Sequence, residues 1–317
     1  MGERTSEVWS EMNYMLPAAK QLFVDVTPRP DETAATRAQL EKDFFSSVRL
    51  SNGVFKTTSA LRLDDVNTDL VALFQKLGVG PKTFLDVAVS SGISTIEWFE
   101  SLQQARLKPS MTATDLTMTA YLVRLGSWCN VLVDTEGFPL QYECCGFALR
   151  PWSPKRYYVL GDCFLTMLYR ALYRRFGQRL GLLKRLKSLQ GNSPPIDDPV
   201  IKARIQLVTW RLRGNKDIEL LDDDITQPTP SQLRGRFEVI RAANILNRDY
   251  FSVPQLREAV RNLRGRLVGP GTFLVIVCTE ETGGNHGSVF RLGQTGSFEV
   301  LTRVGRGSEI EDIVLSV

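Results

Sequence analysis

The residues best suited to chemistry lie in one short turn that follows a run of apolar residues. The turn passes through Asp86, Ala88, Ser90 and Gly92, and a helix is expected to begin directly after it. Small residues let a ligand approach the backbone, and the first N–H groups of a helix have no partner inside that helix. Such a turn can hold a polar group of a ligand against the backbone.

Carboxylates follow two further predicted strands. Asp115 ends the second strand, and Asp224 follows the third, together with Asp222 and Asp223. Because ligands of open α/β sheets bind at the carboxyl ends of the strands, these acids should border the same crevice as the turn. An acid at the end of the second strand is placed to accept hydrogen bonds from ribose hydroxyls. Together these residues predict a site for a nucleoside-like ligand.

Two more residues are candidates for contact with a substrate. Asn244 lies just past the fourth predicted strand, and His286, the single histidine, lies in the loop expected after the fifth. A histidine there could remove a proton from an acceptor near neutral pH. Structural interpretations stay open beside these roles: turn chemistry for Asn244, a surface position for His286, a helix cap for Asp115 and a strand-end acid for Asp86. The acids around Asp224 could simply be solvated.

The elements that must position these residues alternate along the chain. Strands are expected at 83–89, 111–115, 218–221, 237–242 and 272–277, with helices at 93–107, at about 116–127 and at 254–267. Shorter β segments are expected at 288–291, 297–302 and 310–315. The alternation predicts an α/β fold: a Rossmann-like, mostly parallel seven-stranded sheet with helices on both faces.

Two segments do not fit this alternation. Residues 1–80 predict an N-terminal helical cap, which Gly78-Val79-Gly80-Pro81 ends. Residues 129–215 predict an insertion: a β-hairpin around the turn 136–139, a basic helix or two over 160–189, and another helical stretch at about 199–213. The Rossmann-like domain would then consist of 81–128 and 216–317.

The composition is that of an ordinary globular protein and argues against several classes. The five cysteines are odd in number, form no CxxC motif and accompany a single histidine. A disulfide framework and a Cys/His metal site are therefore not expected, and no metal is predicted. No apolar run approaches the roughly 20 residues of a membrane span, so the expected location is cytoplasmic.

The basic segment has three interpretations. No acid occurs from Cys163 to Ile196, although the net charge of the whole chain is only +4. The segment could be a substrate-binding lid with a solvated cationic face, or residues 164–187 could contact an anionic membrane peripherally. A nucleic-acid contact is the third interpretation and the least favoured one, because the overall charge is small. The oligomeric state is not readable.

The order of the site motifs resembles that of class I S-adenosylmethionine-dependent methyltransferases. Residues 85–92 look like their glycine-rich motif, Asp115 like the ribose acid, and Asp224 with Ile225 like the adenine-contacting acid and its apolar neighbour. Residues 237–247 resemble the fourth-strand motif, residues 267–277 resemble the segment that follows it, and the terminal strands suit the reversed hairpin of the family.

This resemblance implies S-adenosylmethionine as cofactor and methyl transfer by in-line displacement to an unidentified small-molecule or lipid-like acceptor. The family's usual turn has three glycines, and Ala88 and Ser90 replace two of them here. Each replacement carries a cost if its position needs positive φ. Two alternatives stay open: a non-catalytic Rossmann-like binding protein that has lost or altered cofactor binding, and an NAD(P)-dependent oxidoreductase. The second would require an intact G-x-G-x-x-G, which is missing.

Overall fold

The chain divides into two compact units in a computed structural model. The model describes residues 33–317, except 49, 52–55, 57–58, 145–146, 150–159, 190–197 and 281–282. One unit, called here the five-stranded unit, comprises Met1–Thr57 and Thr119–Leu207, and the other, the seven-stranded unit, comprises Thr58–Met118 and Val208–Val317. Much of the expected N-terminal cap, residues 1–32, lies outside the described residues.

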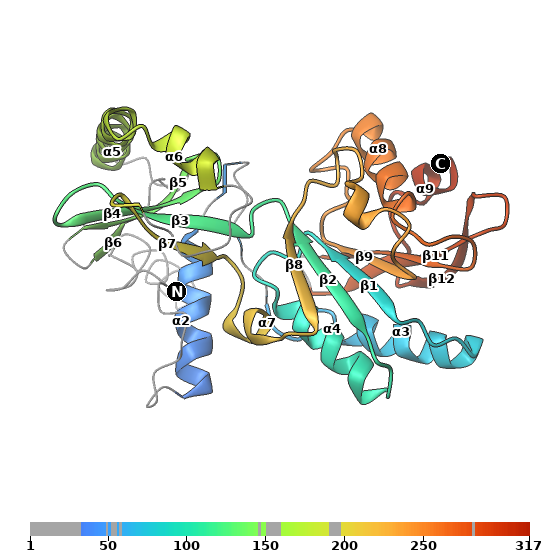
Figure 1. Cartoon of the computed structure of the whole chain (residues 1–317). Coiled ribbons are helices and arrows are strands. Elements are labelled where there is room, and N and C mark those ends of the chain that lie inside the picture. The colour runs from blue at the N-terminus through green and yellow to red at the C-terminus, as the bar shows by residue number, and fades with distance from the viewer. Residues whose placement is uncertain are drawn as a thin grey trace, which may run out of the picture. The chain divides into compact units, whose positions relative to one another are not determined.

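The sheet of the seven-stranded unit has the strand order β12-β11-β10-β9-β1-β2-β8 (Figure 1). The five strands from β10 to β8 pair in parallel, and β11 and β12 add an antiparallel hairpin beside β10. When the parallel strands β1, β2, β8, β9 and β10 are numbered 1 to 5 in chain order, their order from the β8 edge is 3-2-1-4-5. This is the doubly wound Rossmann order. The strands are β1 (Thr83–Val87), β2 (Ser110–Asp115), β8 (Ile218–Asp222), β9 (Val239–Ala243), β10 (Phe273–Thr279), β11 (Asn285–Leu292) and β12 (Phe298–Val304).

Helices cover both faces of this sheet, as the predicted fold class requires (Figure 1). One face packs on α3 (Asp64–Leu77), α4 (Ile93–Gln104) and the short α7 (Trp210–Gly214). The other face packs on α8 (Val253–Arg264) and α9 (Glu311–Leu315). The Rossmann-like fold class is confirmed, and the order of the strands reverses between β1 and β9. That reversal is the topological switch point at which such sheets bind ligands.

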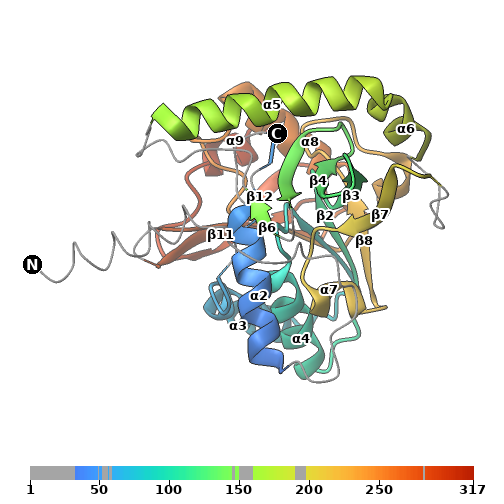
Figure 2. The same ribbon diagram turned by 90° about the vertical axis from the view of Figure 1, so that its left-hand side faces the viewer.

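The five-stranded unit is an antiparallel sheet of order β6-β5-β4-β3-β7. Alternate residues of β3 face opposite sides: Ala120 and Leu122 pack with α2, whereas Tyr121 and Val123 pack with α6. Figure 2 shows α5 as one unbroken helix that leads into α6. The elements are α2 (Ala34–Ser47), β3 (Thr119–Arg124), β4 (Cys129–Asp134), β5 (Pro139–Cys144), β6 (Phe147–Leu149), α5 (Leu160–Arg179), α6 (Leu182–Leu189) and β7 (Ile201–Gln206).

Three of the expected elements are wrong in type. The helix expected at about 116–127 is strand β3, and the helical stretch expected at about 199–213 begins with strand β7 and is helical only from Trp210, in α7. These two segments pair with each other, so each supplies the hydrogen-bond partners that the other needs. The β segment expected at 310–315 contains helix α9, because Ile310, Ile313 and Val314 are buried together at helical spacing.

The unit boundaries also differ from the expected ones. The second unit resumes at Thr119 and ends at Leu207, whereas an insertion over 129–215 was expected. The expected 1–80 cap is divided: α2 packs on the five-stranded sheet, and α3 packs on the seven-stranded one. In the part of the chain that the structure describes, no helix is both long and apolar enough to span a membrane.

A buried ion pair joins the two strands at the switch point. Asp86 on β1 lies beside Arg241 on β9 in the strand register, and both side chains are almost fully buried. The guanidinium donates two hydrogen bonds to the carboxylate, at 2.9 and 2.6 Å. It also donates to the Asn67 side chain and the Ser94 carbonyl, and it lies 4.2 Å from the ring centroid of Trp98. The pair therefore connects β1 and β9 to both α3 and α4.

Replacing Arg241 by Met should cost about 3–5 kcal/mol of unfolding free energy, because the Asp86 carboxylate would stay buried without its cation. Urea unfolding followed by circular dichroism measures this loss. The double variant Asp86→Leu/Arg241→Met, which removes both charges, should recover most of it. A single variant within about 1 kcal/mol of wild type would contradict this account of the pair.

Candidate functional site

The turn after β1 adopts left-handed backbone conformations at alternate residues. The φ angles are +56° at Ala88, +58° at Ser90 and +81° at Gly92. These are the three positions that the family's motif gives to glycine, and side chains disfavour such angles by about 1–2 kcal/mol per residue. Both replacements therefore stand where glycine would be least strained, and the turn keeps its conformation despite them.

Hydrogen bonds that the turn donates to β2 hold the strained backbone. The Ser90 amide donates to Asp115 Oδ2 at 2.7 Å, and the Val89 amide donates to the Thr114 carbonyl at 3.1 Å. Asp115 Oδ1 accepts from the Thr117 amide at 3.2 Å. The predicted turn and the predicted ribose acid are thus in direct contact.

Gly92 is the N-cap of α4, and no side chain caps this helix. Its own amide donates to the Val89 carbonyl at 2.9 Å, so it closes the turn. A Cβ added to Gly92 would lie 2.1 Å from Cδ2 of Leu212, a buried residue of α7. The missing side chain thus makes room for α7. The N–H groups that could meet a ligand are those of the first turn of α4.

The acids that follow β8 have different surroundings. Asp222 Oδ1 accepts from the Met118 amide at 2.6 Å, and Asp223 forms a buried ion pair with Arg266 at 2.6 Å. The Asp223 amide donates to the Asp115 carbonyl at 2.9 Å, which brings the end of β8 against the predicted ribose acid.

Asp224, the predicted adenine-contacting acid, is half-buried. Its Oδ1 accepts from the amide and the hydroxyl of Thr226, at 2.9 and 2.7 Å. This turn fixes the carboxylate next to the end of β8. Its role toward a ligand stays a prediction.

Asp86 lies below the turn in the core of the unit. Besides Arg241, its carboxylate accepts from the hydroxyl of Thr95 at 2.7 Å. Through these contacts, Asp86 joins β1, β9 and α4. A direct contact with a cofactor, which the sequence pattern predicted, would have to be made in addition to them.

Asn244 also has φ near +60°, at the end of β9. Its Oδ1 accepts from the Thr279 amide at 2.6 Å, and the Thr279 hydroxyl donates to Asn285 Oδ1 at 2.8 Å. Asn285 in turn donates to the Arg62 carbonyl and to Asp65. Asn244 thus starts a polar chain along the sheet edge from β9 to α3. Contact of Asn244 with a substrate stays a prediction.

His286 lies in strand β11, not in the loop that was expected. Its Nδ1 accepts from the Arg306 amide at 2.9 Å, and its Nε2 is 3.4 Å from Glu280. The ring thereby fixes the turn after β12. The strands β9 and β10 separate β11 from β1, which places the histidine about 14 Å across the sheet from the end of β1. A catalytic role for His286 stays a prediction, and its contacts do not bring it to the turn.

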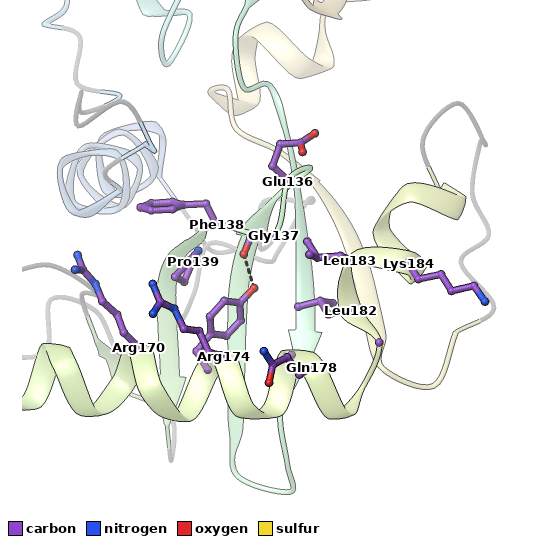
Figure 3. Close-up of a pocket in the computed structure, with 13 residues that line it drawn as sticks. Glu136, Gly137, Phe138, Pro139, Arg170, Arg174, Gln178, Leu182, Leu183 and Lys184 are labelled. Atoms are coloured by element: carbon purple, nitrogen blue, oxygen red, sulfur yellow. Dashed lines mark hydrogen bonds between the residues drawn. The ribbon is translucent and has the colours of Figure 1, made fainter.

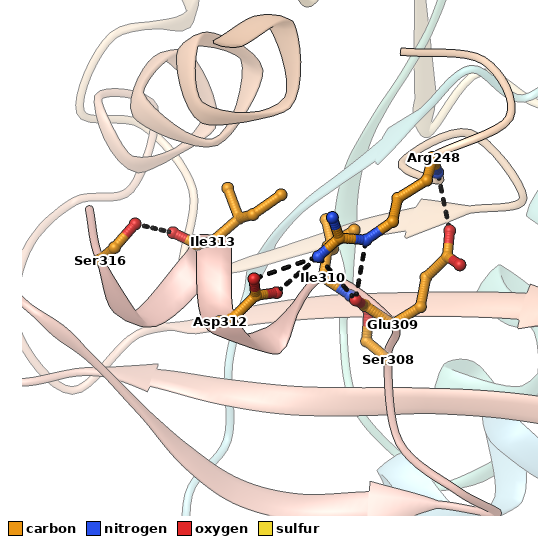
Figure 4. Close-up of polar contacts among 7 residues, drawn as sticks. All are labelled: Arg248, Ser308, Glu309, Ile310, Asp312, Ile313 and Ser316. Atoms are coloured by element: carbon orange, nitrogen blue, oxygen red, sulfur yellow. Dashed lines mark hydrogen bonds and ion pairs between the residues drawn. The ribbon is translucent and has the colours of Figure 1, made fainter. Parts of the chain in front are cut away.

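The loop after β9 is tied to the C-terminal helix. The Arg248 guanidinium donates to both carboxylate oxygens of Asp312 and to the Glu309 carbonyl, and the Arg248 amide donates to the Glu309 carboxylate (Figure 4). Ser308 and Ile310 flank this contact in the turn before α9. The loop that follows Asn244 is therefore held by its contacts with α9 and with the turn before α9, which are not part of the sheet.

The sequence pattern missed Glu97, which lies on α4 four residues after its start. The Leu61 amide donates to Glu97 Oε1 at 2.8 Å, and Oε2 is buried with no hydrogen-bond partner among the described residues. Burial raises the pKa of the Glu97 carboxyl, with Asp64 as a minor like charge. Glu97 lies on the helix that begins directly after the turn, and a carboxyl with a raised pKa is a candidate acid or base. In the sequence, Glu97 looks like any helical glutamate.

Comparisons with known proteins give distant matches. No protein-family model matches the chain, and no curated protein matches it. The C-methyltransferase domain of the citrinin polyketide synthase is 14% identical, over 79% of this chain and 41% of that chain, with a TM-score of 0.35.

Two further solved structures align over more of their own length. The N-methyltransferase NodS from Bradyrhizobium japonicum WM9, in complex with S-adenosyl-L-homocysteine, is 15% identical over 78% of this chain and 75% of that chain (TM-score 0.32). The SAM-bound amino pentose methyltransferase CalS10 from Micromonospora echinaspora is 12% identical over 92% and 89% (TM-score 0.34). These scores are too low for the likeness to identify an activity, and the strand order itself establishes the fold.

Replacing Ala88 or Ser90 by Gly should raise the unfolding free energy by about 0.5–1 kcal/mol each, because glycine relieves the positive φ at some cost in chain entropy. Chemical denaturation measures the change. Ala113→Gly, in the neighbouring strand β2, is the matched control and should lower the free energy instead. Equal losses for Ala88→Gly and Ala113→Gly would show that the turn is not strained.

Glu97→Gln gives a test of the raised pKa through stability. Because the folded state raises this pKa above its ordinary 4.5, the protonated carboxyl contributes stability that is complete below pH 4.5 and is lost as the pH rises through the raised value. The unfolding free energy of wild type should therefore fall relative to the variant between about pH 4 and pH 7. Glu100→Gln on the same helix controls for charge, since its side chain is 42% exposed. A difference independent of pH would remove Glu97 as a perturbed group.

Proposed function

We propose that the seven-stranded unit is an S-adenosylmethionine-dependent methyltransferase. The observation that supports it best is the hydrogen bond of 2.7 Å between the Ser90 amide and the Asp115 carboxylate at the switch point. This contact brings together the turn and the acid, and a nucleoside cofactor would need both of them in the same crevice. A Rossmann sheet alone would not distinguish this function from many others.

The residues around this hydrogen bond fit an adenosyl group. Two buried hydroxyls, those of Ser91 and Thr114, have no hydrogen-bond partner among the described residues. Asp115 carries a carboxylate, the group that accepts ribose hydroxyls at the end of the second strand of such sheets, and Asp224 keeps a second carboxylate oxygen beside the end of β8. Buried polar groups normally find partners, so open hydroxyls at this edge favour a polar ligand.

The chemistry asked of the chain is mainly positioning. S-adenosylmethionine, when bound, supplies a methyl group that is already activated for transfer. The chain must then hold the acceptor in line with that group, which can lower the barrier by several kcal/mol. Asn244 borders the switch point and is proposed to orient the acceptor. Glu97, whose pKa burial raises, is proposed to take the proton of an acceptor that is protonated when it attacks.

A non-catalytic binding protein is the second candidate. It is favoured by the positive φ of Ala88 and Ser90, which keep side chains where the motif has none. A methyl and a hydroxymethyl group add little bulk, and both residues are half-buried. They would nevertheless weaken a contact in which the ligand meets the bare backbone.

Isothermal titration with S-adenosylmethionine, S-adenosylhomocysteine and NAD separates the candidates. Under the proposal, the first two bind and NAD does not. Asp115→Asn should weaken both affinities about tenfold or more, which is about 1.4 kcal/mol, because one acceptor oxygen of the ribose site is lost. Asp249→Asn, an exposed acid after β9, is the matched control and should bind as wild type does.

Three results would contradict the proposal. Binding of NAD alone would favour an oxidoreductase, and binding of none of the three would favour a protein that has lost its cofactor. An unchanged affinity in Asp115→Asn, with S-adenosylmethionine bound, would move the cofactor away from this crevice. Urea unfolding of each variant shows whether a lost affinity reflects a lost fold.

A further inference from the structure

The five-stranded unit contains a cavity of about 740 Å³, and none of its lining residues belongs to the cofactor site proposed above. It lies between the tip of the β4–β5 hairpin, residues 136–139, and the two helices α5 and α6 (Figure 3). Ligand sites in proteins commonly have volumes of about 300–1,000 Å³, with mostly apolar walls and a few polar groups. The size of this cavity suits one small molecule or one lipid chain.

Hydrogen bonds fix the hairpin that forms one wall. Asp134 Oδ1 accepts from the Glu136 and Phe138 amides, at 3.0 and 2.7 Å. The Tyr173 hydroxyl on α5 donates to the Gly137 carbonyl, and burial raises the pKa of this phenol, so that it stays a donor. The wall is therefore formed in advance by contacts of the protein with itself.

The walls expose apolar side chains. Phe138 on the hairpin and Leu183 on α6 line the cavity, and Leu183 is 57% exposed. Pro139 and the buried Leu182 complete this surface. Apolar surface gathered in a concave site gains free energy when a hydrocarbon group covers it, at about 25 cal/mol per Å².

Two arginines lie at one end of the cavity. Arg170 and Arg174 are one helical turn apart on α5, and Figure 3 shows both side chains extending on the side of Phe138 and Pro139. Among the residues that the structure describes, neither guanidinium has an ion-pair or hydrogen-bond partner. Arg185 of α6, in contrast, pairs with Asp198 at 2.6 Å. Two adjacent unpaired guanidinium groups suit a phosphate or carboxylate.

We propose that this cavity binds an anionic amphiphile, a hydrocarbon chain that carries a phosphate or carboxylate head. The chain would cover Phe138, Leu182 and Leu183, and the head would lie between Arg170 and Arg174. Lys184 adds positive charge at the rim, and Glu136 is the one carboxylate among the lining residues. A free amphiphile and a lipid in an anionic membrane share this chemistry.

The outer face of α5 fits the membrane source. Leu168, Leu172 and Phe176 are exposed and spaced four apart, so they form one stripe along the helix. Arg175 and Arg179 lie beside this stripe and are exposed as well. Apolar residues between cations are typical of helices that lie in an anionic bilayer surface. A nucleic acid would use the cations but would leave the apolar stripe uncovered.

The test uses the full chain and dodecyl phosphate below its micelle concentration, with calorimetric detection. Wild type should bind it, and Arg170→Gln/Arg174→Gln should lose about tenfold or more in affinity. The matched control Arg175→Gln/Arg179→Gln removes the same charge from the same helix without lining the cavity, and it should stay within about threefold of wild type. Glu136→Gln should bind about two- to threefold more tightly, because a like charge is removed.

Several outcomes would overturn the proposal. No binding by wild type would do so, and so would equal losses in the two arginine pairs, which would indicate charge attraction alone. Inorganic phosphate or dodecanol binding as tightly as dodecyl phosphate would show that head and chain are not both recognised. Binding of an RNA oligonucleotide, with no response to dodecyl phosphate, would assign the cations to nucleic acid.

Vesicles identify the source of the ligand. With phosphatidylcholine vesicles that contain phosphatidylglycerol, co-sedimentation of wild type that is lost in Arg170→Gln/Arg174→Gln indicates a membrane lipid. Binding of dodecyl phosphate without co-sedimentation indicates a free amphiphile. Both results support the cavity as the site, and neither depends on binding of S-adenosylmethionine.

Discussion

The ion pair between Asp86 and Arg241 is the contact on which the seven-stranded unit depends. A fully buried guanidinium is tolerated only where acceptors surround it, and here they come from β1, α3 and α4. Because the pair is bidentate, it also fixes the register of β1 against β9. The turn at 88–92 begins directly after β1, and α4 begins directly after the turn. The geometry of the proposed cofactor site therefore follows from a charge pair that the ligand need not touch.

The next constraint is the strain in that turn. Ala88 and Ser90 hold positive φ angles that glycine would hold at less cost, and the hydrogen bonds from the amides of Val89 and Ser90 to β2 offset it. The Asp115 carboxylate consequently stabilises the backbone of the turn. The cofactor site proposed above would use the same side chain, so that the affinity for a ligand and the conformation of the turn would be coupled. The hydrogen bonds to β2 explain how a turn with two replaced glycines can hold its positive φ angles.

Much of the sheet was predictable because its buried strands are short apolar runs bounded by turn residues, as in β1, β9 and β10. The sequence pattern predicted the wrong secondary structure where pairing with a distant segment, and not the local sequence, determines it. Strands β3 and β7 were predicted as helices. Each pairs with the other, and this pairing of segments far apart in the sequence is not visible in either segment alone. The spacing of Ile310, Ile313 and Val314 could have indicated α9. The turn and Asp115 were predicted to lie together, and they do. The partner of Asp86 was not predicted, because Arg241 lies 155 residues away in the sequence and no residue near Asp86 indicates the pair.

The two units differ in how their arginines are paired, and the net charge of the chain does not show this difference. In the seven-stranded unit, arginines such as Arg241, Arg266 and Arg303 each meet a carboxylate, so their charge is used to hold the structure. On α5, Arg170 and Arg174 meet none among the described residues, although they stand beside a cavity with apolar walls. A cation that stabilises no partner inside the chain keeps its full attraction for a partner outside it. The +4 of the whole chain hides this difference, because paired acids and bases cancel in the sum, whereas Arg170 and Arg174 stand one turn apart on one helix. The unpaired cations of α5 are therefore the feature that favours the anionic amphiphile proposed for the cavity.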